Sequence, residues 1–393
     1  MTDRFINPIF AKPISNVYLM SNTSKVIDLY SGVGGLSLGA VKANFDLIGA
    51  VEYEKRIIDS HSRNFPKSTH ICKDVSSLNG RELSNLTQLG SDELCGLIGG
   101  PPCQGFSTIG KRNLDDHRNK LFDHFFRLAS EIKPVFFMAE NVPGILNEKY
   151  SEIRKNAFKT VESDYNLLEP IKINASEFGA ATTRTRVFFI GVRRDISGAE
   201  LIPEAITNLK TINSNFVKDA LEGLPIKVSD SWTDYSSSWQ KISFFDKHRY
   251  LNSLNLIIDG LGDDGAINRF LKDKEVSGCF GTKHAPAIAF RYANLKPGQQ
   301  DSVSKSVKLR QDGYCPTLRA GTDSTKGSYQ AVRPIHPTEA RVITPREAAR
   351  LQGFPDWFQF HETKWHSFRQ IGNSVCPIAA EKVLTAVKES LSI

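Results

Sequence analysis

Between residues 25 and 194 the chain alternates short apolar runs with amphipathic segments. The apolar runs are KVIDLY, DLIGAVE, LCGLIGG, PVFFMAENV, NLLEPIKIN and TRVFFIGV. Segments with helical spacing, such as EKRIIDSHSRNF and NKLFDHFFRLASEI, lie between several of them. Short buried strands that alternate with helices are typical of an open, mostly parallel sheet covered by helices on both faces. The pattern therefore predicts a doubly wound α/β domain.

The regular alternation ends near residue 195. From there to about residue 340 no period is clear, and SDSWTDYSSSW is a polar loop that carries aromatic residues. Helical spacing returns in PREAARLQGF and SVCPIAAEKVLTAVKESL. We therefore predict that residues 1–195 form the first part of the α/β domain and that residues 196–340 form a second, smaller, irregular domain. Residues 341–393 are expected to return and complete the first domain.

Composition and charge narrow the class of protein. The 393 residues are 40% hydrophobic and 24% charged, which is ordinary for a globular protein and enough for two lobes. The formal net charge of +7 favours an acidic partner such as nucleic acid. The first residues, MTDRFINPIFAKPISNVYLM, lack a long apolar core and a small-residue cleavage pattern, so we expect no signal peptide. No segment has the length and apolarity of a membrane-spanning helix.

The six cysteines do not form a metal-binding or disulfide pattern. No two are spaced as a C-x-x-C pair, and we expect neither a metal site nor a disulfide framework. Five of them are expected to pack as small hydrophobic residues. Cys103 is the exception that we single out from the set Cys72, Cys95, Cys103, Cys279, Cys315 and Cys376.

Cys103 lies in GGPPCQGFS, directly after an apolar run. Ligands of open α/β sheets bind at the carboxyl ends of the strands. The apolar run is predicted to be a strand, so Cys103 lies just after the carboxyl end of that strand. Pro101 and Pro102 restrict the backbone that leads to the thiol, which favours a nucleophile held at one point. The polar segment TIGKRNLDDHRNK that follows is suited to close over a substrate. The alternative interpretation is a buried, unreactive cysteine.

A glycine-rich turn follows the first apolar run, in VIDLYSGVGGLSLGA. Gly32, Gly34 and Gly35 allow a tight turn and a close approach of the backbone to a ligand. Only part of the dinucleotide-binding fingerprint is present, because Ser37 stands where a third glycine would fall. An ordinary turn between a strand and a helix is the alternative.

Two acidic residues end the next two apolar runs. Glu52 follows the glycine turn by about 20 residues, the position from which a carboxylate binds ribose hydroxyls. Asp74, at the end of HICKDV, is suited to bind the amino group of adenine. Together with the glycine turn, these residues predict a cofactor that contains adenosine.

Three further residues are candidates for chemistry at the same edge of the sheet. Glu140 ends a strand in AENVPG, where a carboxyl group with a raised pKa donates a proton to a ring nitrogen. Arg184 and Arg186, in TRTRVFFIG, share one face of a strand and suit a phosphate or a carbonyl oxygen. The alternatives are an Asn-capped helix start for ENVPG and a solvated strand entrance for the arginines.

The order of these motifs resembles the DNA (cytosine-5)-methyltransferase family. The resemblance rests on DLYSGVGGLSLG, GGPPCQGFS, AENVPG, RTRVFFIG, RLQGFPDWF and QIGNSVCPIAA, and it covers about residues 25–195 and 341–385. It implies the Rossmann-like fold of S-adenosylmethionine-dependent methyltransferases. Relatives usually have Pro-Gln ahead of the paired arginines, whereas this chain has Ala181 and Thr182.

The resemblance also implies a cofactor site for S-adenosyl-L-methionine. Tyr30 would lie against the adenosine, Glu52 would bind the ribose, and Tyr53 and Asp74 would contact the adenine. The return segment would complete the pocket near Pro101. The full set implied by similarity is Tyr30, Gly32, Gly34, Gly35, Glu52, Tyr53, Asp74, Val75, Pro101, Asn373 and Ser374.

The catalytic roles come from the same resemblance. The target cytosine would be flipped out of the duplex, and the Cys103 thiolate would add to its C6 atom. Glu140 would stabilise the N3 edge, while Arg184 and Arg186 would hold the base and the active-site loop. The residues implied in contacts with DNA are Gln104, Ser107 and Thr317.

The expected function is methylation of C5 of cytosine in a short DNA sequence, as the modification half of a bacterial restriction system. The implied partners are double-stranded DNA and a restriction endonuclease of the same specificity; we expect a monomer in the bacterial cytoplasm, associated with the nucleoid. Residues 196–340 would read the sequence, with CPTLRAGTD and KHAPAIAFRYANLKPGQQ as contact segments.

Two other functions are open to the same family. The first is a tRNA cytosine-5 methyltransferase, whose branch typically carries a Cys-Phe-Thr element that this chain lacks. The second is an inactive DNA-binding relative. That alternative predicts damage to the cysteine or the glutamate, and both Cys103 and Glu140 are intact.

Overall fold

The computed structural model describes residues 24–90, 93–102, 120–229, 238–243, 248–320 and 332–393. The predicted residues Cys103, Gln104 and Ser107 lie outside these ranges, as does most of the polar segment that follows the cysteine.

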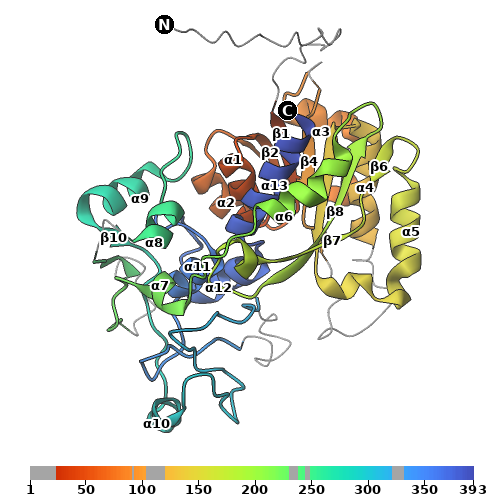
Figure 1. Ribbon diagram of the computed structural model, residues 1–393. Coiled ribbons are helices and arrows are strands. Elements are labelled where there is room, and N and C mark those ends of the chain that lie inside the picture. Colours follow the sequence, from red (N-terminus) through yellow and green to blue (C-terminus); the bar gives the residue numbers. More distant parts are fainter. Residues whose placement is uncertain (1–23, 91–92, 103–119, 230–237, 244–247, 321–331) are drawn as a thin grey trace, which may run out of the picture.

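An eight-stranded sheet forms the centre of the first lobe (Figure 1). Its order is β3-β2-β1-β4-β5-β8-β6, with β7 also paired to β8. The first five strands are parallel, and β8 runs antiparallel to β5. The strands are β1 (Lys25–Leu29), β2 (Asp46–Glu52), β3 (Thr69–Cys72), β4 (Gly96–Gly99), β5 (Phe136–Asn141), β6 (Tyr165–Leu167), β7 (Ile171–Asn174) and β8 (Thr185–Arg193).

The sheet confirms the mostly parallel, doubly wound fold and corrects one strand. NLLEPIKIN forms two short strands, β6 and β7, and both pair with β8. The interruption lies at Pro170, which has no N–H group to donate to a neighbouring strand.

Helices cover both faces of the sheet, and each face has its own hydrophobic core (Figure 1). Val26 of β1 packs into the first core and Ile27 into the second, as expected for neighbouring residues of a strand. Helices α1 (Gly35–Lys42), α6 (Ile202–Asn208) and α13 (Pro377–Leu391) contribute to the first core. Helices α3 (Gly80–Leu86), α4 (Lys120–Ile132) and α5 (Ser151–Lys159) contribute to the second.

The second lobe contains little regular structure, in agreement with the sequence pattern. Helix α10 lies at its far end (Figure 1). The elements are α7 (Val217–Leu221), β9 (Gln240–Lys241), α8 (Arg249–Leu254), α9 (Asp264–Asn268), a π-helical turn (Arg269–Asp273), β10 (Glu275–Val276) and α10 (Pro286–Asn294). Helix α6 belongs by its residue numbers to the predicted second domain, residues 196–340, but it packs against α13 of the first lobe. The exact boundaries of the domains therefore stay a prediction.

Helices α11 (Pro345–Gln352) and α12 (Lys364–Asn373) link the lobes. A buried ion pair explains part of the RLQGFPDWF motif: Arg350 Nε and Nη2 donate to the two carboxylate oxygens of Asp356 at 2.7 and 2.8 Å. Arg350 also donates to the carbonyls of Ala220 and Glu222 in the second lobe. Burial alone would raise the pKa of Asp356, but Arg350 outweighs it and lowers that pKa. The pair therefore fastens the second lobe to α11.

Over the part of the chain that the structure describes, none of the helices has the length and apolarity needed to cross a membrane.

Candidate functional site

The glycine turn after β1 contains two glycines in a backbone conformation that other residues rarely adopt. Gly32 and Gly34 have φ angles of 56° and 102°, in the left-handed region that favours glycine. A Cβ atom on Gly34 would lie 2.3 Å from Phe65 Cε2, so the backbone of the turn packs directly against the Phe65 ring. A Cβ on Gly32 would meet no atom within 4 Å, so this side of the turn faces open space among the described residues.

Glu52, at the carboxyl end of β2, is held beside this turn. Its carboxylate accepts hydrogen bonds from the backbone N–H groups of Gly32 at 3.2 Å and of Glu54 at 3.0 Å. Burial raises the pKa of Glu52, and these two hydrogen bonds oppose that rise. The neighbouring Tyr53 ring is 75% exposed. A fixed carboxylate beside an exposed aromatic ring is a suitable pair for a ribose and a base.

The other residues on this side have structural contacts of their own. Asp74 Oδ1 accepts from the Ser76 backbone N–H at 2.8 Å and so caps a short 3-10 helix. Val75 is buried in the second core, so its side chain is not presented to a ligand. The Tyr30 hydroxyl donates to the Leu121 carbonyl at 2.7 Å. The roles of these residues toward a cofactor stay predictions.

The return segment closes against the glycine turn, as its predicted place requires. A Cβ on Gly35 would lie 2.0 Å from Ser374 Oγ and 2.3 Å from the Val375 carbonyl oxygen. Asn373, the last residue of α12, is exposed next to Ser374. An ion pair between Glu54 and Arg369, at 2.7 Å, fastens α12 beside β2. Residues more than 300 positions apart therefore meet at one turn.

Glu140 is buried at the carboxyl end of β5, at the same edge of the sheet. It is 8% exposed, and Arg186 Nε lies 2.7 Å from its Oε1 atom. A Cβ on Gly100 would lie 3.3 Å from Glu140 Oε2, so the carboxyl group borders the segment that leads to Cys103. Burial raises the pKa of Glu140, while Arg186 and Arg184 oppose that rise.

The two structural alternatives for these motifs do not hold. Asn141 is not a helix cap: the 3-10 helix that follows begins after Val142, and Asn141 Nδ2 donates to the Pro101 carbonyl at 3.3 Å. Arg184 is 2% exposed, so it does not stand in a solvated strand entrance. Because β5 and β8 are antiparallel, with Asn141 opposite Val187, the start of β8 meets the end of β5.

A segment of the second lobe crosses this site, and we call residues 315–320 the strap. The Cys315 N–H donates to the Ala181 carbonyl at 2.9 Å, and Thr182 Oγ1 donates to the Cys315 carbonyl at 3.0 Å. Arg184 Nη1 donates to the Leu318 carbonyl at 3.2 Å. Ala181 and Thr182, which stand where relatives usually have Pro-Gln, are thus among the residues that bind the strap.

The far end of the strap lies against α12. A Cβ on Gly372 would be 2.6 Å from the Ala320 backbone nitrogen. Thr317 is exposed in the middle of the strap, but its predicted contact with DNA is not tested. We predicted CPTLRAGTD to be a segment that contacts DNA. No feature of the sequence predicts its hydrogen bonds to residues 181–184.

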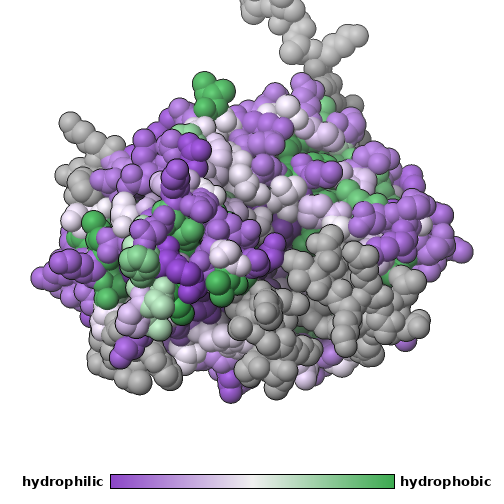
Figure 2. All heavy atoms as spheres, turned by 90° about the horizontal axis from the view of Figure 1, so that it is seen from below, coloured by the Kyte–Doolittle hydropathy of each residue, from purple (hydrophilic) through white to green (hydrophobic). Residues whose placement is uncertain are grey.

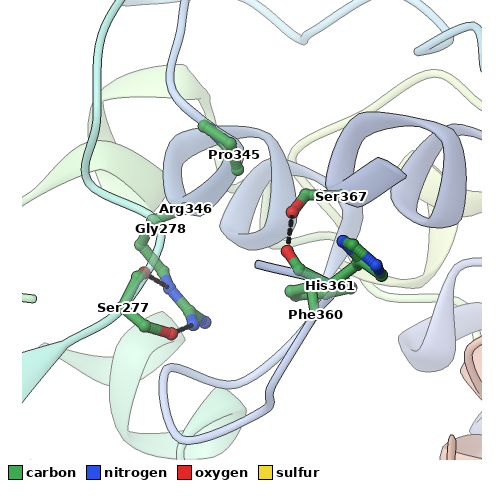
Figure 3. A pocket seen from close by; sticks show the side chains of 7 residues that line it. All are labelled: Ser277, Gly278, Pro345, Arg346, Phe360, His361 and Ser367. Atoms are coloured by element: carbon green, nitrogen blue, oxygen red, sulfur yellow. Dashed lines mark hydrogen bonds between the residues drawn. The ribbon is translucent and has the colours of Figure 1, made fainter. Parts of the chain in front are cut away.

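Two cavities that border the described part of the second lobe differ in size. The pocket in Figure 3, between the Ser277–Gly278 segment, α11 and α12, has a volume of about 10 Å³, and one of its lining residues, Arg346, donates to the Ser277 carbonyl. A groove of about 300 Å³ lies beside the strap, lined by Lys308, Arg310 and Tyr314 among others. The described surface of the face in Figure 2 is mainly hydrophilic, with separate hydrophobic patches.

The cysteines other than Cys103 are free thiols. Four of them, Cys95, Cys279, Cys315 and Cys376, are buried as expected. The prediction for Cys72 is wrong: it is exposed, because it ends β3 at the rim of the sheet, and its Sγ donates to the Tyr53 carbonyl at 3.6 Å.

Comparisons with known proteins agree with this arrangement. The family model for C-5 cytosine-specific DNA methylase matches residues 24–389. The type II methyltransferase M.XorII of Xanthomonas oryzae pv. oryzae is 38% identical over 368 residues, which cover 93% of this chain and 84% of that protein. The type II methyltransferase M.FnuDI of Fusobacterium nucleatum is 29% identical, with 94% and 95% covered.

A solved structure is similar over nearly the whole length. It is a protein assigned as a DNA modification methyltransferase encoded within a prophage (E. coli), with 48% identity and a TM-score of 0.82; 94% of this chain and 99% of that chain are covered. With a family model that spans the two lobes and relatives that match end to end, the chain belongs to the C-5 cytosine-specific DNA methylase family.

Proposed function

We propose that this DNA cytosine-5 methyltransferase transfers a methyl group from S-adenosylmethionine to one cytosine in a short, specific sequence of double-stranded DNA. It would protect host DNA from a restriction endonuclease of the same specificity. The observation that carries the proposal is the group formed by the buried Glu140 and Arg184 and the partly buried Arg186, which borders the segment leading to Cys103.

The residues around the glycine turn fit the cofactor. Gly32 leaves open space where a side chain would stand, Glu52 offers a fixed carboxylate to the ribose hydroxyls, and Tyr53 exposes a ring to the adenine. Ser374 and Asn373 border the turn from the other side. When bound, S-adenosylmethionine supplies an electrophilic methyl group.

The target base needs a pocket that a duplex cannot enter, so we propose that the cytosine is flipped out of the helix. Burial raises the pKa of Glu140 and so favours its protonated form, and we propose that this form donates a proton toward N3 of the base. Arg186 holds that carboxyl group in place through its ion pair, and the positive charge of Arg184 lies near enough to oppose the rise in the pKa of Glu140. Their charges also suit the oxygen of the base.

The proposed chemistry uses Cys103 as a nucleophile. Its thiolate forms a bond to C6, and the electron density that reaches C5 makes this carbon attack the methyl group, whose bond to the sulfur would break with release of S-adenosylhomocysteine. Loss of the C5 proton to a base then expels the thiolate, breaks the S–C6 bond and restores the aromatic ring. Each turnover therefore releases one proton and leaves the cysteine unchanged.

The second lobe would read the DNA sequence. We propose that residues 196–340 form this recognition domain, with Gln104, Ser107 and Thr317 in contact with the DNA. The exposed position of Thr317 on the strap, next to a groove lined by Lys308 and Arg310, supports a contact there. One bound strand carries the target base, so a monomer suffices.

The test is methyl transfer from radiolabelled S-adenosylmethionine to plasmid DNA and, in parallel, to tRNA. We expect 5-methylcytosine at one short repeated DNA sequence and no label with Cys103→Ala. The matched control is Cys72→Ser, because Cys72 is an exposed thiol without a proposed role. Label only in tRNA would establish the RNA branch instead, and DNA binding without any label would establish an inactive relative.

A second experiment tests the covalent step. In a duplex with 5-fluorocytosine at the target position the C5 substituent cannot leave as a proton does, so the adduct persists. We expect a protein–DNA complex that survives denaturing electrophoresis in the wild type and in Cys72→Ser, and none in Cys103→Ala. A complex that survives in Cys103→Ala would refute the assignment of the nucleophile.

A further inference from the structure

Four polar side chains form a hydrogen-bonded chain beneath the glycine turn. Ser37 Oγ lies 2.5 Å from Asp28 Oδ2 and 3.0 Å from His61 Nε2. The other ring nitrogen, His61 Nδ1, lies 3.0 Å from His70 Nε2. The four residues come from four different elements: β1, α1, α2 (Lys55–Asn64) and β3.

The chain is isolated from solvent except at one end. Asp28, Ser37 and His61 are fully buried, while His70 is half-buried. Burial lowers the pKa of His61 far below its usual value, and His70 lowers it further, so the ring is neutral. A neutral imidazole donates from one nitrogen and accepts at the other. The hydrogen bonds of the chain must therefore all run in one direction.

The charge of Asp28 sets that direction. With Asp28 ionised, His70 donates to His61, His61 donates to Ser37, and Ser37 donates to the carboxylate. Burial raises the pKa of Asp28 to about 7; the Ser37 hydrogen bond opposes this rise, and Glu52 adds to it. With Asp28 protonated at Oδ2, the carboxyl group donates to Ser37, and every bond in the chain reverses. Either state satisfies the Ser37 hydroxyl and both His61 nitrogens.

The same imidazole supports the backbone of the turn. His61 stacks on Phe65 with ring centroids 4.3 Å apart. A Cβ on Gly34 would lie 2.3 Å from Phe65 and 3.1 Å from His61 Cδ2, so the turn rests on both rings. The Gly34 N–H donates to the Ser31 carbonyl, and the Gly34 carbonyl accepts from Leu38. Ser37 directly precedes Leu38, whose N–H group makes the hydrogen bond to the Gly34 carbonyl.

We infer that His61 is a positioning residue for cofactor binding, which acts through Ser37 and Gly34 to hold the glycine turn in its binding geometry. The inference rests on the proposal that the cofactor binds at this turn. It gives Ser37 a purpose at the position where the dinucleotide-binding fingerprint has a third glycine: the hydroxyl connects α1 to a residue of α2.

The test compares three substitutions of His61. His61→Phe keeps a ring against Phe65 and Gly34 and removes both hydrogen bonds. Glutamine places its amide near the position of Nε2, so His61→Gln keeps the bond to Ser37. Asparagine places its amide near Nδ1, so His61→Asn keeps only the bond toward His70. The matched control is Ser62→Ala, one position along α2, whose hydroxyl bonds only to the Asp59 carbonyl of its own helix.

Two readouts are measured on the full-length protein. The first is the Kd of S-adenosylmethionine by calorimetry without DNA, followed by KM and kcat for methyl transfer. We expect Kd and KM to rise about tenfold in His61→Phe and His61→Asn, as loss of a buried hydrogen bond implies. We expect kcat at saturating cofactor to stay within about twofold, since the interaction is made equally before and during reaction. His61→Gln and Ser62→Ala should resemble the wild type.

The second readout is amide hydrogen exchange of residues 32–38, which does not depend on any ligand. Exchange there should be about tenfold faster in His61→Phe and unchanged in His61→Gln, because local opening is easier without the bond to Ser37. Equal behaviour of all three His61 variants in both readouts would overturn the inference. If the wild type fails to bind S-adenosylmethionine while exchange is still faster in His61→Phe than in His61→Gln, the proposed cofactor is refuted and the structural support of the turn by His61 stays in place.

Discussion

Glu140 is closely surrounded at the carboxyl end of β5. Its carboxyl group is buried, 2.7 Å from the Arg186 guanidinium and next to the Gly100 backbone. Burial favours the protonated form and the arginines favour the ionised form. Because burial has the larger effect, the group keeps its proton to a higher pH than an exposed glutamate does.

Glu140→Gln should therefore abolish most of the activity without removing the protein's fold. The amide retains a polar partner for Arg186 but cannot give up a proton, so we expect kcat to fall about 100-fold or more. In the wild type, kcat should decrease as the pH rises through the raised pKa of this group, since deprotonation removes the donor.

The measurement is kcat for methyl transfer as a function of pH, together with the Kd for DNA. The alkaline decrease that Glu140 causes should be missing from Glu140→Gln, and the Kd should change less than about threefold, because the substitution keeps the shape of the pocket. An unchanged kcat would exclude Glu140 from the chemistry.

Between elements, the ion pair of Arg350 and Asp356 fixes the guanidinium with which α11 binds the second lobe. Both side chains are fully buried, and Arg350 reaches the carbonyls of Ala220 and Glu222. The Tyr250 hydroxyl donates to the Arg350 carbonyl at 2.8 Å and adds a second connection. A buried charge that loses its partner carries an uncompensated desolvation cost.

Asp356→Asn should consequently destabilise the protein by about 3–5 kcal/mol, the usual cost of breaking a buried ion pair. Urea unfolding gives the free energy of unfolding, and Asp312→Asn is the matched control because its partner Arg310 lies at the surface. Surface ion pairs contribute only about 0–1 kcal/mol. Equal effects of the two substitutions would show that the buried pair is not what joins the lobes.

The strap contacts residues 181–184 through hydrogen bonds of its backbone and Gly372 of α12 through close packing, so its position depends on both. Gly372→Ala places a methyl group 2.6 Å from the Ala320 nitrogen, and a backbone atom cannot move aside cheaply. We expect kcat/KM for DNA to fall about tenfold or more, because a displacement of about 1 Å at a catalytic group has such an effect.

The control for this substitution is Gly265→Ala in α9, whose new Cβ would lie 3.1 Å from a side-chain oxygen of Asp263 and would meet no strap atom within 4 Å. Methyl transfer at subsaturating DNA is the measurement for both. Wild-type kinetics in Gly372→Ala would mean that the strap tolerates displacement and does not position Arg184.

The elements were largely predictable because periodicity is a local property. NKLFDHFFRLASEI forms α4 and TRVFFIGV forms most of β8, as their periodicity predicts. NLLEPIKIN is interrupted because of one residue, Pro170, and periodicity does not show the effect of a single missing N–H group. The site was predictable only where a motif carries its own chemistry, as at Glu140. The hydrogen bond from Arg184 to Leu318 joins residues 134 positions apart, and no local pattern encodes such a contact.

Over the whole molecule, the net charge of +7 and the mainly hydrophilic face in Figure 2 suit a polyanion. Binding of DNA would involve two costs: release of the target base from its stack and closure of the protein around it. A duplex whose target cytosine faces no partner base avoids much of the first cost.

Such a duplex should therefore bind about tenfold more tightly than the paired duplex, since unstacking and unpairing cost a few kcal/mol. Fluorescence anisotropy at several salt concentrations is the measurement. Both affinities should fall with added salt by the same slope, because the phosphate contacts are shared. Equal affinities for the two duplexes would argue against base flipping.

The strap also bears on how new specificities arise and how they could be built. A recognition region that is exchanged between relatives must arrive with a segment that binds Ala181 and Thr182 at one end and lies flush against Gly372 at the other. A chimera in which the replaced region ends before Cys315 would keep the strap of this protein and take its DNA specificity from the relative. A chimera in which the replaced region extends beyond Ala320 would contain the relative's strap, which would fit residues 181–184 and Gly372 less well. We expect the second chimera to bind its DNA sequence but to methylate it poorly.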